Sequence, residues 1–403
     1  MPVILSAVLL IAAIGISSLS RKAPQQQKEA PASATVSETA NVQSDKTLND
    51  MRGVWITYME LSMAAESDKS EGAFRRKFEK LAADCKGFGL NTLIVQVRPF
   101  CDALYESDLF PASHILSGTQ GVGAGYDALA VMCEIAEKNN LKIHAWVNPY
   151  RVTANETPKE LSEDNPYVKH PEWCLECESG IILDPSNENA RQLILDGVSE
   201  IVKNYAVDGV QFDDYFYPTD IGNADKAQYE AYLQSVPQER AMDLETWRRF
   251  NVSLLVSETY LNVHRVRDDM VFGISPQGNL ANNQKLCADV ENWCAKRGFL
   301  DYICPQIYFS LDNPALEFEK ALSDWTALDF ADNVRLYVGL AGYKAGTEAD
   351  QGTWLESGNI LAEEYMILKK NQRVNGMMLY SAASLNDSDA QTEMQALKTA
   401  LTQ

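Results

Sequence analysis

The sequence predicts an α/β protein in which residues 51–403 form a (β/α)8 barrel, and three observations support this fold class. First, short apolar runs alternate with stretches of helical periodicity, which is typical of a parallel sheet covered by helices. Second, the pattern repeats over roughly 330 residues, a length that suits a closed barrel with loop insertions. Third, the turn after the first run, Thr57–Glu60, contains no glycine, which disfavours an open doubly wound sheet.

The apolar runs are the predicted strands, because each is almost continuously apolar, as a strand buried on both faces must be. They are Gly53–Tyr58, Thr92–Arg98, Lys142–Pro149, Gly209–Tyr215, Val271–Pro276, Asp301–Tyr308, Arg335–Gly342 and Gly376–Ser381. The predicted helices are Phe74–Phe88, Tyr126–Asn140, Asn187–Tyr205, Leu244–Val263, Asn282–Arg297, Leu316–Thr326, Ile360–Lys370 and Ser388–Leu401. Two long connections, within 150–208 and 216–243, follow strand ends, so we expect them to wall the face where barrel enzymes place their sites.

The segment before the barrel has two parts. Val3–Ile16 is an unbroken run of apolar and small residues, so residues 1–20 are predicted to be a signal peptide or a membrane anchor. Residues 21–50 are rich in Pro, Gln, Ala, Ser and Thr, a composition typical of a disordered linker. This layout predicts a protein that is secreted or anchored at the bacterial cell surface, outside the cytoplasm.

Composition excludes some partners. The net charge of −21 repels nucleic acid, so a nucleic-acid partner is not expected. The chain has 8 cysteines, and those in predicted strands and on apolar helix faces, such as Cys85, Cys133 and Cys304, are expected to be buried free thiols. Cys174 and Cys177 have a metal-like spacing, but no second pair matches them. We therefore expect neither a metal nor a cofactor.

Polar side chains gather where the predicted strands end. The fourth strand ends in Asp213 and Asp214, and a buried carboxyl group must be paired, neutralised or placed in a wet cleft. Because side chains alternate along a strand, Asp213 shares a face with Gln211, while Asp214 shares one with Val210 and Phe212. We interpret the first face as the barrel interior, so Asp213 is expected to project into the pocket, and Asp214 to reach it only through a bulge.

These residue types fit the cleavage of a glycosidic bond, which needs two carboxyl groups flanking the bond. Asp213 or Asp214 supplies one. Asp102 is the favoured second carboxylate, ahead of other acidic residues in the loops. The expected substrate-binding residues are Arg98, Asn148, Arg151, Asp184, Tyr215, Tyr217, Ser275, Gln306 and Tyr308. Further aromatic residues at the strand ends suit the flat faces of sugar rings: Tyr58, Tyr150, Trp173, Phe216, Phe309, Tyr343 and Tyr380.

Several motifs together resemble the glycosyl hydrolase-like 10 family of exported bacterial TIM-barrel proteins. They are Arg52-Gly-Val-Trp-Ile-Thr, Asn91-Thr-Leu-Ile-Val-Gln-Val-Arg-Pro, Asp102-Ala-Leu-Tyr, His144-Ala-Trp-Val-Asn-Pro-Tyr-Arg, Leu183-Asp-Pro, Asp208-Gly-Val-Gln-Phe-Asp-Asp-Tyr-Phe-Tyr-Pro, Gly273-Ile-Ser-Pro and Pro305-Gln-Ile-Tyr. The resemblance implies a glycoside hydrolase acting on cell-envelope glycan such as peptidoglycan strands.

A looser resemblance to family 18 chitinases places Tyr215 where those enzymes carry their catalytic Glu, and Gln211 at the first inner Asp. Their substrate-assisted mechanism therefore does not transfer to this chain. The leading hypothesis is carboxylate acid/base cleavage of an envelope polysaccharide, with peptidoglycan glycan strands the favoured substrate. The alternative is a barrel that binds or scaffolds carbohydrate without cutting it. A metal-dependent deacetylase or esterase is disfavoured, because the 4 histidines are scattered.

Overall fold

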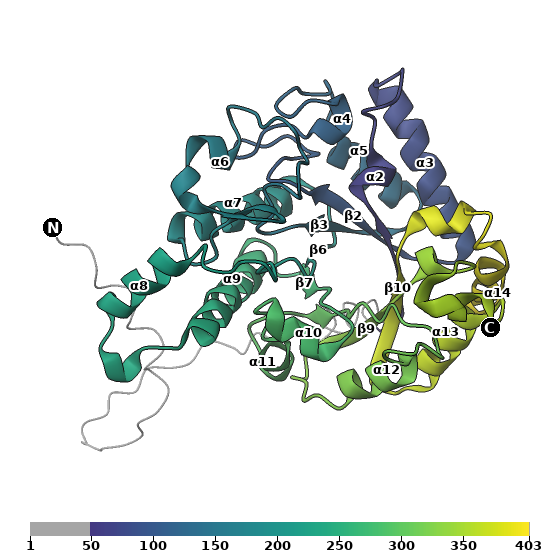
Figure 1. Cartoon of the computed structure of the whole chain (residues 1–403). Coiled ribbons are helices and arrows are strands. Elements are labelled where there is room, and N and C mark those ends of the chain that lie inside the picture. Colours follow the sequence, from purple (N-terminus) through teal and green to yellow (C-terminus); the bar gives the residue numbers. More distant parts are fainter. Residues whose placement is uncertain (1–48, 403) are drawn as a thin grey trace, which may run out of the picture. The chain divides into compact units, whose positions relative to one another are not determined.

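The computed structural model describes residues 49–402, in which eight parallel strands close into a barrel surrounded by helices (Figure 1). The barrel order is β1-β10-β9-β8-β7-β6-β3-β2. The strands are β1 (Met51–Ile56), β2 (Thr92–Arg98), β3 (Lys142–Val147), β6 (Gly209–Phe212), β7 (Val271–Ile274), β8 (Tyr302–Ile303), β9 (Arg335–Leu340) and β10 (Val374–Leu379). Pairing of Met51 with Gly376 joins the first strand to the last. The predicted (β/α)8 barrel is confirmed.

Large side chains fill the barrel interior. One apolar cluster contains Met51, Trp55, Ile94, Trp146, Tyr302, Cys304, Tyr337 and Met378. Gln211 points into the same space, where it accepts a hydrogen bond from Trp55 Nε1 at 2.6 Å and donates one to the Tyr302 hydroxyl at 3.2 Å. Gly273 makes room for this packing, since a Cβ there would lie 2.1 Å from the Tyr302 ring. The interior is therefore a packed core, and the open space lies at its mouth.

The outer helices bury apolar faces against the barrel. They are α3 (Glu71–Phe88), α5 (Ala128–Lys138), α7 (Glu188–Asn204), α9 (Leu244–Val266), α10 (Leu280–Lys285), α11 (Val290–Ala295), α12 (Phe318–Thr326), α13 (Ile360–Lys370) and α14 (Gln391–Leu401). Side chains of Ser70, Asp127, Asn187 and Asp243 accept hydrogen bonds from the first turns of α3, α5, α7 and α9. These caps satisfy backbone N–H groups that have no partner within a helix.

Most predicted boundaries differ from the structure by a few residues, and two predicted elements differ more. The single helix expected over 282–297 is broken into α10 and α11, and Cys287 between them has a φ of 57°, which a helix does not allow. The strand expected over 301–308 pairs regularly only at Tyr302–Ile303. Pro305 lacks an N–H for the ladder, and Gln306 then makes isolated bridges to Gln277 and Gly339.

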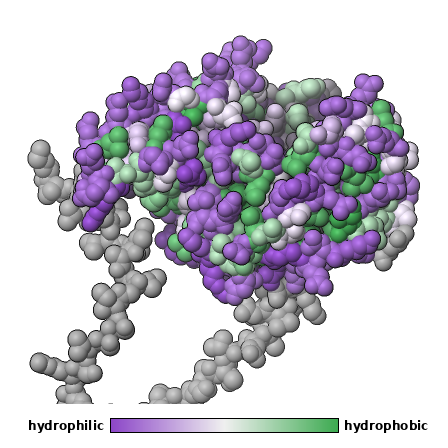
Figure 2. All heavy atoms as spheres, turned by 60° about the horizontal axis from the view of Figure 1, so that its bottom comes forward, coloured by the Kyte–Doolittle hydropathy of each residue, from purple (hydrophilic) through white to green (hydrophobic). Residues whose placement is uncertain are grey.

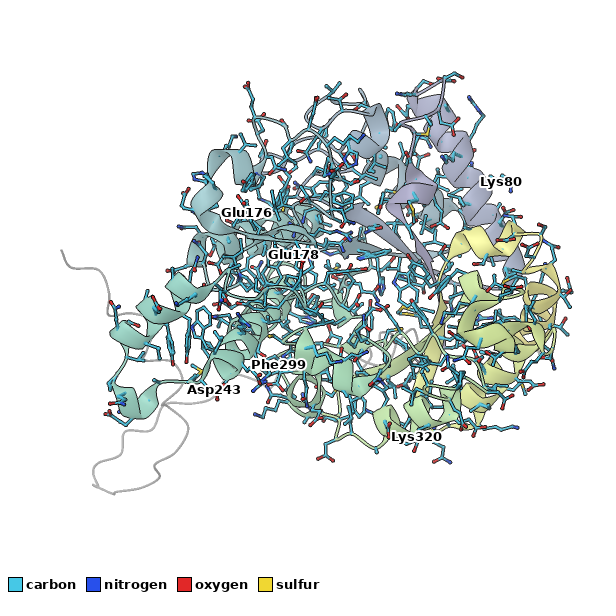
Figure 3. The ribbon with its side chains drawn as sticks, in the orientation of Figure 1. Lys80, Glu176, Glu178, Asp243, Phe299 and Lys320 are labelled. Carbon is cyan, nitrogen blue, oxygen red and sulfur yellow. The ribbon has the colours of Figure 1, made fainter. Side chains whose placement is uncertain are left out.

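The connections contain elements that the sequence did not predict. The connection after β3 holds α6 (Pro166–Lys169) and a hairpin of β4 (Cys174–Cys177) and β5 (Gly180–Leu183). Glu176 and Glu178 mark this hairpin in Figure 3. The connection after β6 holds α8 (Lys226–Ser235), which buries none of its side chains and so has no apolar stripe. The remaining short elements are α2 (Tyr58–Leu61), α4 (His114–Ser117) and the 3₁₀ turns Pro171–Trp173, Gln238–Arg240, Gly342–Lys344, Ala349–Leu355 and Ala382–Asn386.

The other expectations have mixed outcomes. All the cysteines are free thiols, and Cys85, Cys133 and Cys304 are buried as expected. Across residues 49–402, no helix is long and apolar enough to cross a membrane. The predicted signal or anchor over 1–20 and almost all of the linker over 21–50 lie outside the described residues. Figure 2 shows one face of the barrel domain, on which hydrophilic side chains dominate and apolar residues form small groups.

Candidate active site

Two adjacent carboxyl groups lie where β6 ends. The regular pairing of β6 stops at Phe212, so Asp213 and Asp214 follow the last paired residue, at the mouth of the barrel. The two residues are only 3% and 7% exposed. Isolated ionised carboxylates at such burial would be strongly unfavourable, so their hydrogen-bond partners determine what they can do.

Three donors hold Asp213. Its Oδ2 accepts hydrogen bonds from Trp146 Nε1, at 3.1 Å, and from Asn148 Nδ2. Its Oδ1 accepts one from the backbone N–H of Tyr215 at 3.3 Å. Trp146 belongs to the interior cluster, so Asp213 does lie on the interior side of the strand, as alternation along β6 predicts.

A chain of amides fixes the orientation of Asn148. The backbone N–H of Tyr58 donates to Gln96 Oε1 at 3.0 Å, and Gln96 Nε2 donates to Asn148 Oδ1 at 2.7 Å. Because a backbone N–H can only donate, it determines which end of each amide faces which neighbour. The amino group of Asn148 must then face Asp213. This chain links residues that follow or belong to β1, β2, β3 and β6.

Asp214 has a separate set of partners. Its Oδ1 accepts a hydrogen bond from Gln306 Nε2 at 3.0 Å, and its Oδ2 accepts one from Gln277. Gln306 Nε2 also contacts the backbone oxygen of Ser275 at 3.0 Å, and the Gln277 backbone is held by Asn283. These partners follow β7 and β8, so the two carboxyl groups are held from opposite sides of β6 in the barrel order.

Burial also raises the pKa of both carboxyl groups. For Asp213 burial is the largest cause; the nearby Arg151 charge opposes it, Asp214 adds to it, and the pKa rises to about 7. For Asp214 burial raises the pKa against the hydrogen bonds from Gln277 and Gln306. Two neighbouring buried carboxyl groups resist ionising together, so the pair can hold one proton near neutral pH. An acid and a carboxylate side by side are the groups that general acid–base chemistry needs.

Asp214 opens onto a cavity of about 430 Å³, and Asp213 lies next to it in the chain, behind the residues that line this cavity. Asp214, Tyr215 and Gln277 line it on one side. Thr153, Asn155 and Gly180, from the connection that carries the β4–β5 hairpin, line it on the other. Tyr215 is 57% exposed, and the Arg151 guanidinium lies over its ring, 5.1 Å from the centroid. The two long connections therefore wall this cavity, as the sequence predicts.

An aromatic group lies at the strand ends on the β1, β8 and β10 side. The Tyr308 ring is 5.7 Å from Tyr380 and 5.8 Å from Tyr343, measured between centroids, and Trp55 is 6.0 Å from Tyr380. Burial is the main cause that raises the pKa of Tyr380, and the charges of Glu60, Tyr215 and Asp213 add to it, so this group lies near the pair. Tyr343 is 50% exposed. Rings of this kind suit the apolar faces of sugars.

The structure does not bring every predicted site residue to the pair. Asp102 is 0% exposed, and its Oδ2 contacts His114 Nδ1 at 2.8 Å and Gln120 Nε2 at 3.2 Å, all within the connection after β2. Arg98 is also fully buried, with its guanidinium 4.5 Å from the Phe110 ring. Among the described residues, the side chains of Asp102 and Arg98 form no hydrogen bond with Asp213 or Asp214, although the Arg98 backbone oxygen accepts a hydrogen bond from the backbone N–H of Asn148 at 3.1 Å.

Three other predicted residues are also buried. Asp184 is 1% exposed and accepts hydrogen bonds from the backbone and hydroxyl of Ser186. Tyr217 lines the cavity but is 1% exposed, and its ring lies under the Arg248 guanidinium. Ser275 contributes its backbone oxygen to Gln306. Asn148, Arg151, Tyr215, Gln306 and Tyr308 remain as the predicted residues that lie around the pair.

Three residues that support the pair were not among the predicted site residues. Trp146 lies within a strand, where an indole is as readily explained by packing, and Gln96, near the end of the second predicted strand, acts through Asn148. Gln277 follows the fifth strand of the barrel, where its position could have identified it. Across the described residues, no group of three or more His, Cys, Asp or Glu side chains is placed to hold a metal ion.

The family model and the relatives that match this chain are all described as glycosyl hydrolases or as similar to them. The family model described as glycosyl hydrolase-like 10 matches residues 50–356. The chain is 35% identical over 373 residues to glycosyl hydrolase YngK of Bacillus subtilis, covering 86% of this chain and 70% of the relative. It is 28% identical over 429 aligned positions to glycosyl hydrolase DigH of Escherichia coli K12, covering 97% of this chain and 95% of the relative.

Solved structures share the fold at low sequence identity. The glycoside hydrolase domain of PgaB (BpsB) from Bordetella bronchiseptica superposes with a TM-score of 0.58 at 12% identity, covering 86% of this chain and 99% of that one. The catalytic domain of β-amylase from Paenibacillus polymyxa gives 0.55 at 12% identity, covering 87% and 97%. At this identity the likeness shows the barrel fold alone.

Proposed function

The chain belongs to the glycosyl hydrolase-like 10 family, and on that premise we propose that it is a glycoside hydrolase that cuts a polysaccharide of the bacterial cell envelope. The favoured substrate is the glycan strand of peptidoglycan. The observation that carries the proposal is the pair Asp213 and Asp214, two buried carboxyl groups with raised pKa values, of which Asp214 lines a cavity of about 430 Å³.

In this proposal the two carboxyl groups have different roles. Asp213 has its pKa raised to about 7, so it holds a proton near neutral pH and acts as the general acid that protonates the leaving oxygen. Asp214 lines the cavity, and two amide donors stabilise its negative charge. It acts as the carboxylate that supports attack at the anomeric carbon, directly or through water. Asp102 has a structural role in holding its loop.

The cavity and the aromatic group give the substrate two places to bind. A sugar ring in the cavity contacts Tyr215 and Gln277, while the next ring packs against the tyrosines Tyr308, Tyr343 and Tyr380. The expected place of action is outside the cytoplasm, which rests on the composition of residues 1–50 in the sequence.

A reducing-end assay tests the proposal. Full-length protein is incubated with peptidoglycan glycan strands from which the peptides have been removed. We expect the native protein to release new reducing ends, and the double variant Asp213→Asn, Asp214→Asn to release none while still retaining the strands. If the native protein binds the strands and never produces new ends, the barrel is a carbohydrate-binding protein, and the proposed activity is wrong.

A further inference from the structure

A second pocket, of about 580 Å³, lies between the start of α7, the helix α8 and the first half of α9. We call it the outer pocket, and the residues that matter in its lining are Asp184, Gln228, Tyr232, Trp247, Phe250 and Asn251. None of them lines the cavity beside Asp214. Figure 1 shows α8 beside α9, on the side of the barrel where α7 lies. The outer pocket is therefore a candidate site separate from the carboxyl pair.

Aromatic rings form one wall of the outer pocket. The ring centre of Trp247 lies 5.4 Å from that of Tyr229 and 6.0 Å from that of Tyr232, so these three rings hold one another in place. Phe250, about one turn further along α9, is 41% exposed and packs on no other aromatic ring within residues 49–402. A fixed aromatic wall with one open ring is a surface on which the apolar face of a sugar can pack.

Two side-chain amides in the same pocket have atoms without a partner. Burial raises the pKa of Asp184, and hydrogen bonds from Ser186 and Gln228 oppose that rise. Because an ionised carboxyl group only accepts, Gln228 must bond it through its amino group, which leaves the Gln228 side-chain oxygen free. That oxygen and the amino group of Asn251 have no hydrogen-bond partner among the described residues, and both are shielded from water. A ligand group inserted into the pocket can satisfy them after a small rotation of either amide.

A free acceptor and a free donor in one pocket match a neutral sugar. A hydroxyl group both donates and accepts, and an acetamido group carries one donor and one acceptor, whereas a carboxylate only accepts and an ammonium group only donates. The charges agree with this match. Among the described residues that line the pocket, Arg191 is the one cation, and its Nε is paired with Glu258 at 2.8 Å. Glu172 and Glu188 are exposed on the lining, so an acidic sugar would meet negative charge with no free cation beside it.

The outer pocket and the cavity beside the carboxyl pair lie between the same two connections. The connection after β3 supplies Gly180 to the cavity and Asp184 to the outer pocket. The connection after β6 supplies Tyr217 to the cavity and Gln228 to the outer pocket. The guanidinium of Arg248, on the turn of α9 that lines the outer pocket, lies 5.6 Å from the centre of the Tyr217 ring. The two spaces are therefore neighbours, and one polymer can reach both.

Resting on the proposed hydrolase function, we propose that the outer pocket binds a neutral sugar ring of the same glycan strand, away from the bond that is cut. Phe250 packs against the face of this ring, and Gln228 and Asn251 bond its hydroxyl or acetamido groups. Once the mouth of the barrel holds a strand, the contact at the outer pocket is intramolecular and strengthens binding without any change at the carboxyl pair. Long strands then bind more tightly than short ones.

Strand length tests this inference. The kcat/KM of full-length protein is measured on long peptide-free glycan strands and on a tetrasaccharide cut from them, which is too short to span both spaces. Phe250→Ala should lower kcat/KM on the long strands about 10-fold, mostly through KM, and should keep the tetrasaccharide value within about twofold of native. Gln228→Ala should give the same pattern with a loss of about threefold on the long strands, because it removes one hydrogen bond.

Leu261→Ala is the matched control. Leu261 is an exposed apolar residue further along α9 and lines neither space, so its removal should leave both values unchanged. If Phe250→Ala lowers kcat/KM equally on both substrates, or changes neither, the outer pocket does not bind the strand and the inference is wrong.

A neutral oligosaccharide tests the chemistry of the ligand without any cleavage. A fluorescently labelled hexamer of N-acetylglucosamine is titrated into the double variant Asp213→Asn, Asp214→Asn. Adding Phe250→Ala to this variant should weaken binding of the hexamer about fivefold, and adding Leu261→Ala should not. A hexamer of glucosamine carries ammonium groups in place of acetamido groups. If it binds more tightly than the neutral hexamer, and Phe250→Ala removes that advantage, the outer pocket takes cations and the assignment to a neutral sugar is wrong.

The two experiments also separate this inference from the proposed activity. If the native protein cleaves no strand, but Phe250→Ala weakens binding of the neutral hexamer, the hydrolase proposal fails and the outer pocket stands. If the native protein cleaves both substrates, and Phe250→Ala changes neither cleavage nor binding, the hydrolase proposal stands and the outer pocket fails.

Discussion

Two connections at the mouth of the barrel carry buried carboxyl groups, and they differ in where the partners of those groups come from. Asp102, after β2, contacts His114 and Gln120 of its own connection. Asp213 and Asp214, after β6, are held by residues that belong to or follow β3, β7 and β8. A carboxyl group held from within its loop stabilises the loop. One held across several strands is fixed relative to the whole barrel, which is what catalysis requires.

Substitution of Asp102 should therefore lower the free energy of unfolding without slowing catalysis. Asp102→Ala removes a fully buried carboxyl group and leaves the ring nitrogen of His114 and the amide of Gln120 without this partner. We expect unfolding free energy to fall by about 2–3 kcal/mol, measured by denaturant unfolding. The kcat/KM per folded molecule should stay within about twofold of the native value. A large loss of activity at unchanged stability would instead make Asp102 part of the catalytic machinery.

The amides of Gln96 and Asn148 orient Asp213, so removing one of them should slow catalysis. Asn148→Ala removes a donor to Asp213 and the acceptor for Gln96, so the carboxyl group loses part of its fixed orientation. We expect kcat to fall about 10-fold or more, because small misplacements of a reacting group slow catalysis. Asn139→Ala, at the end of α5, is the control, since its side-chain amide donates a hydrogen bond to Ile135 of its own helix, away from the pair, and it should leave kcat unchanged.

The raised pKa of Asp213 predicts the direction of two pH effects. An acid with a pKa near 7 loses its proton above that pH, so activity should decline as pH rises through 7. Its pKa in the unfolded chain is about 4, so ionising it in the folded protein costs stability. Relative to Asp213→Asn, the native protein should gain stability as pH falls from about 8 to about 5. A difference that does not vary with pH would contradict the raised pKa.

Much of the fold follows from local sequence, and less of the site does. Eight apolar runs identify the strands because a strand buried on both faces admits few polar residues. Helix α8 escapes prediction because it buries no side chain and so carries no apolar stripe. Asp213 is identifiable as a mouth residue because the alternation that places Gln211 in the interior extends to it.

The partner of Asp213 is harder to predict. Asp102 follows the second predicted strand and Asp214 ends the fourth, and the sequence analysis took Asp213 or Asp214 as one carboxylate and favoured Asp102 as the second. What separates them is the origin of their donors, His114 and Gln120 in one case and Gln277 and Gln306 in the other. Those contacts depend on how each loop packs, and the spacing of residues in the sequence does not predict them.

The most direct test of the central claim compares Asp213→Asn with Asp102→Asn on the same peptide-free glycan strands. Both changes replace a buried carboxyl group with an amide of the same shape, and kcat is measured per folded molecule. We expect Asp213→Asn to lower kcat by about 1,000-fold, since it removes the acid, and Asp102→Asn to leave it within about twofold. The reverse order would contradict the claim that the pair after β6 is the catalytic centre.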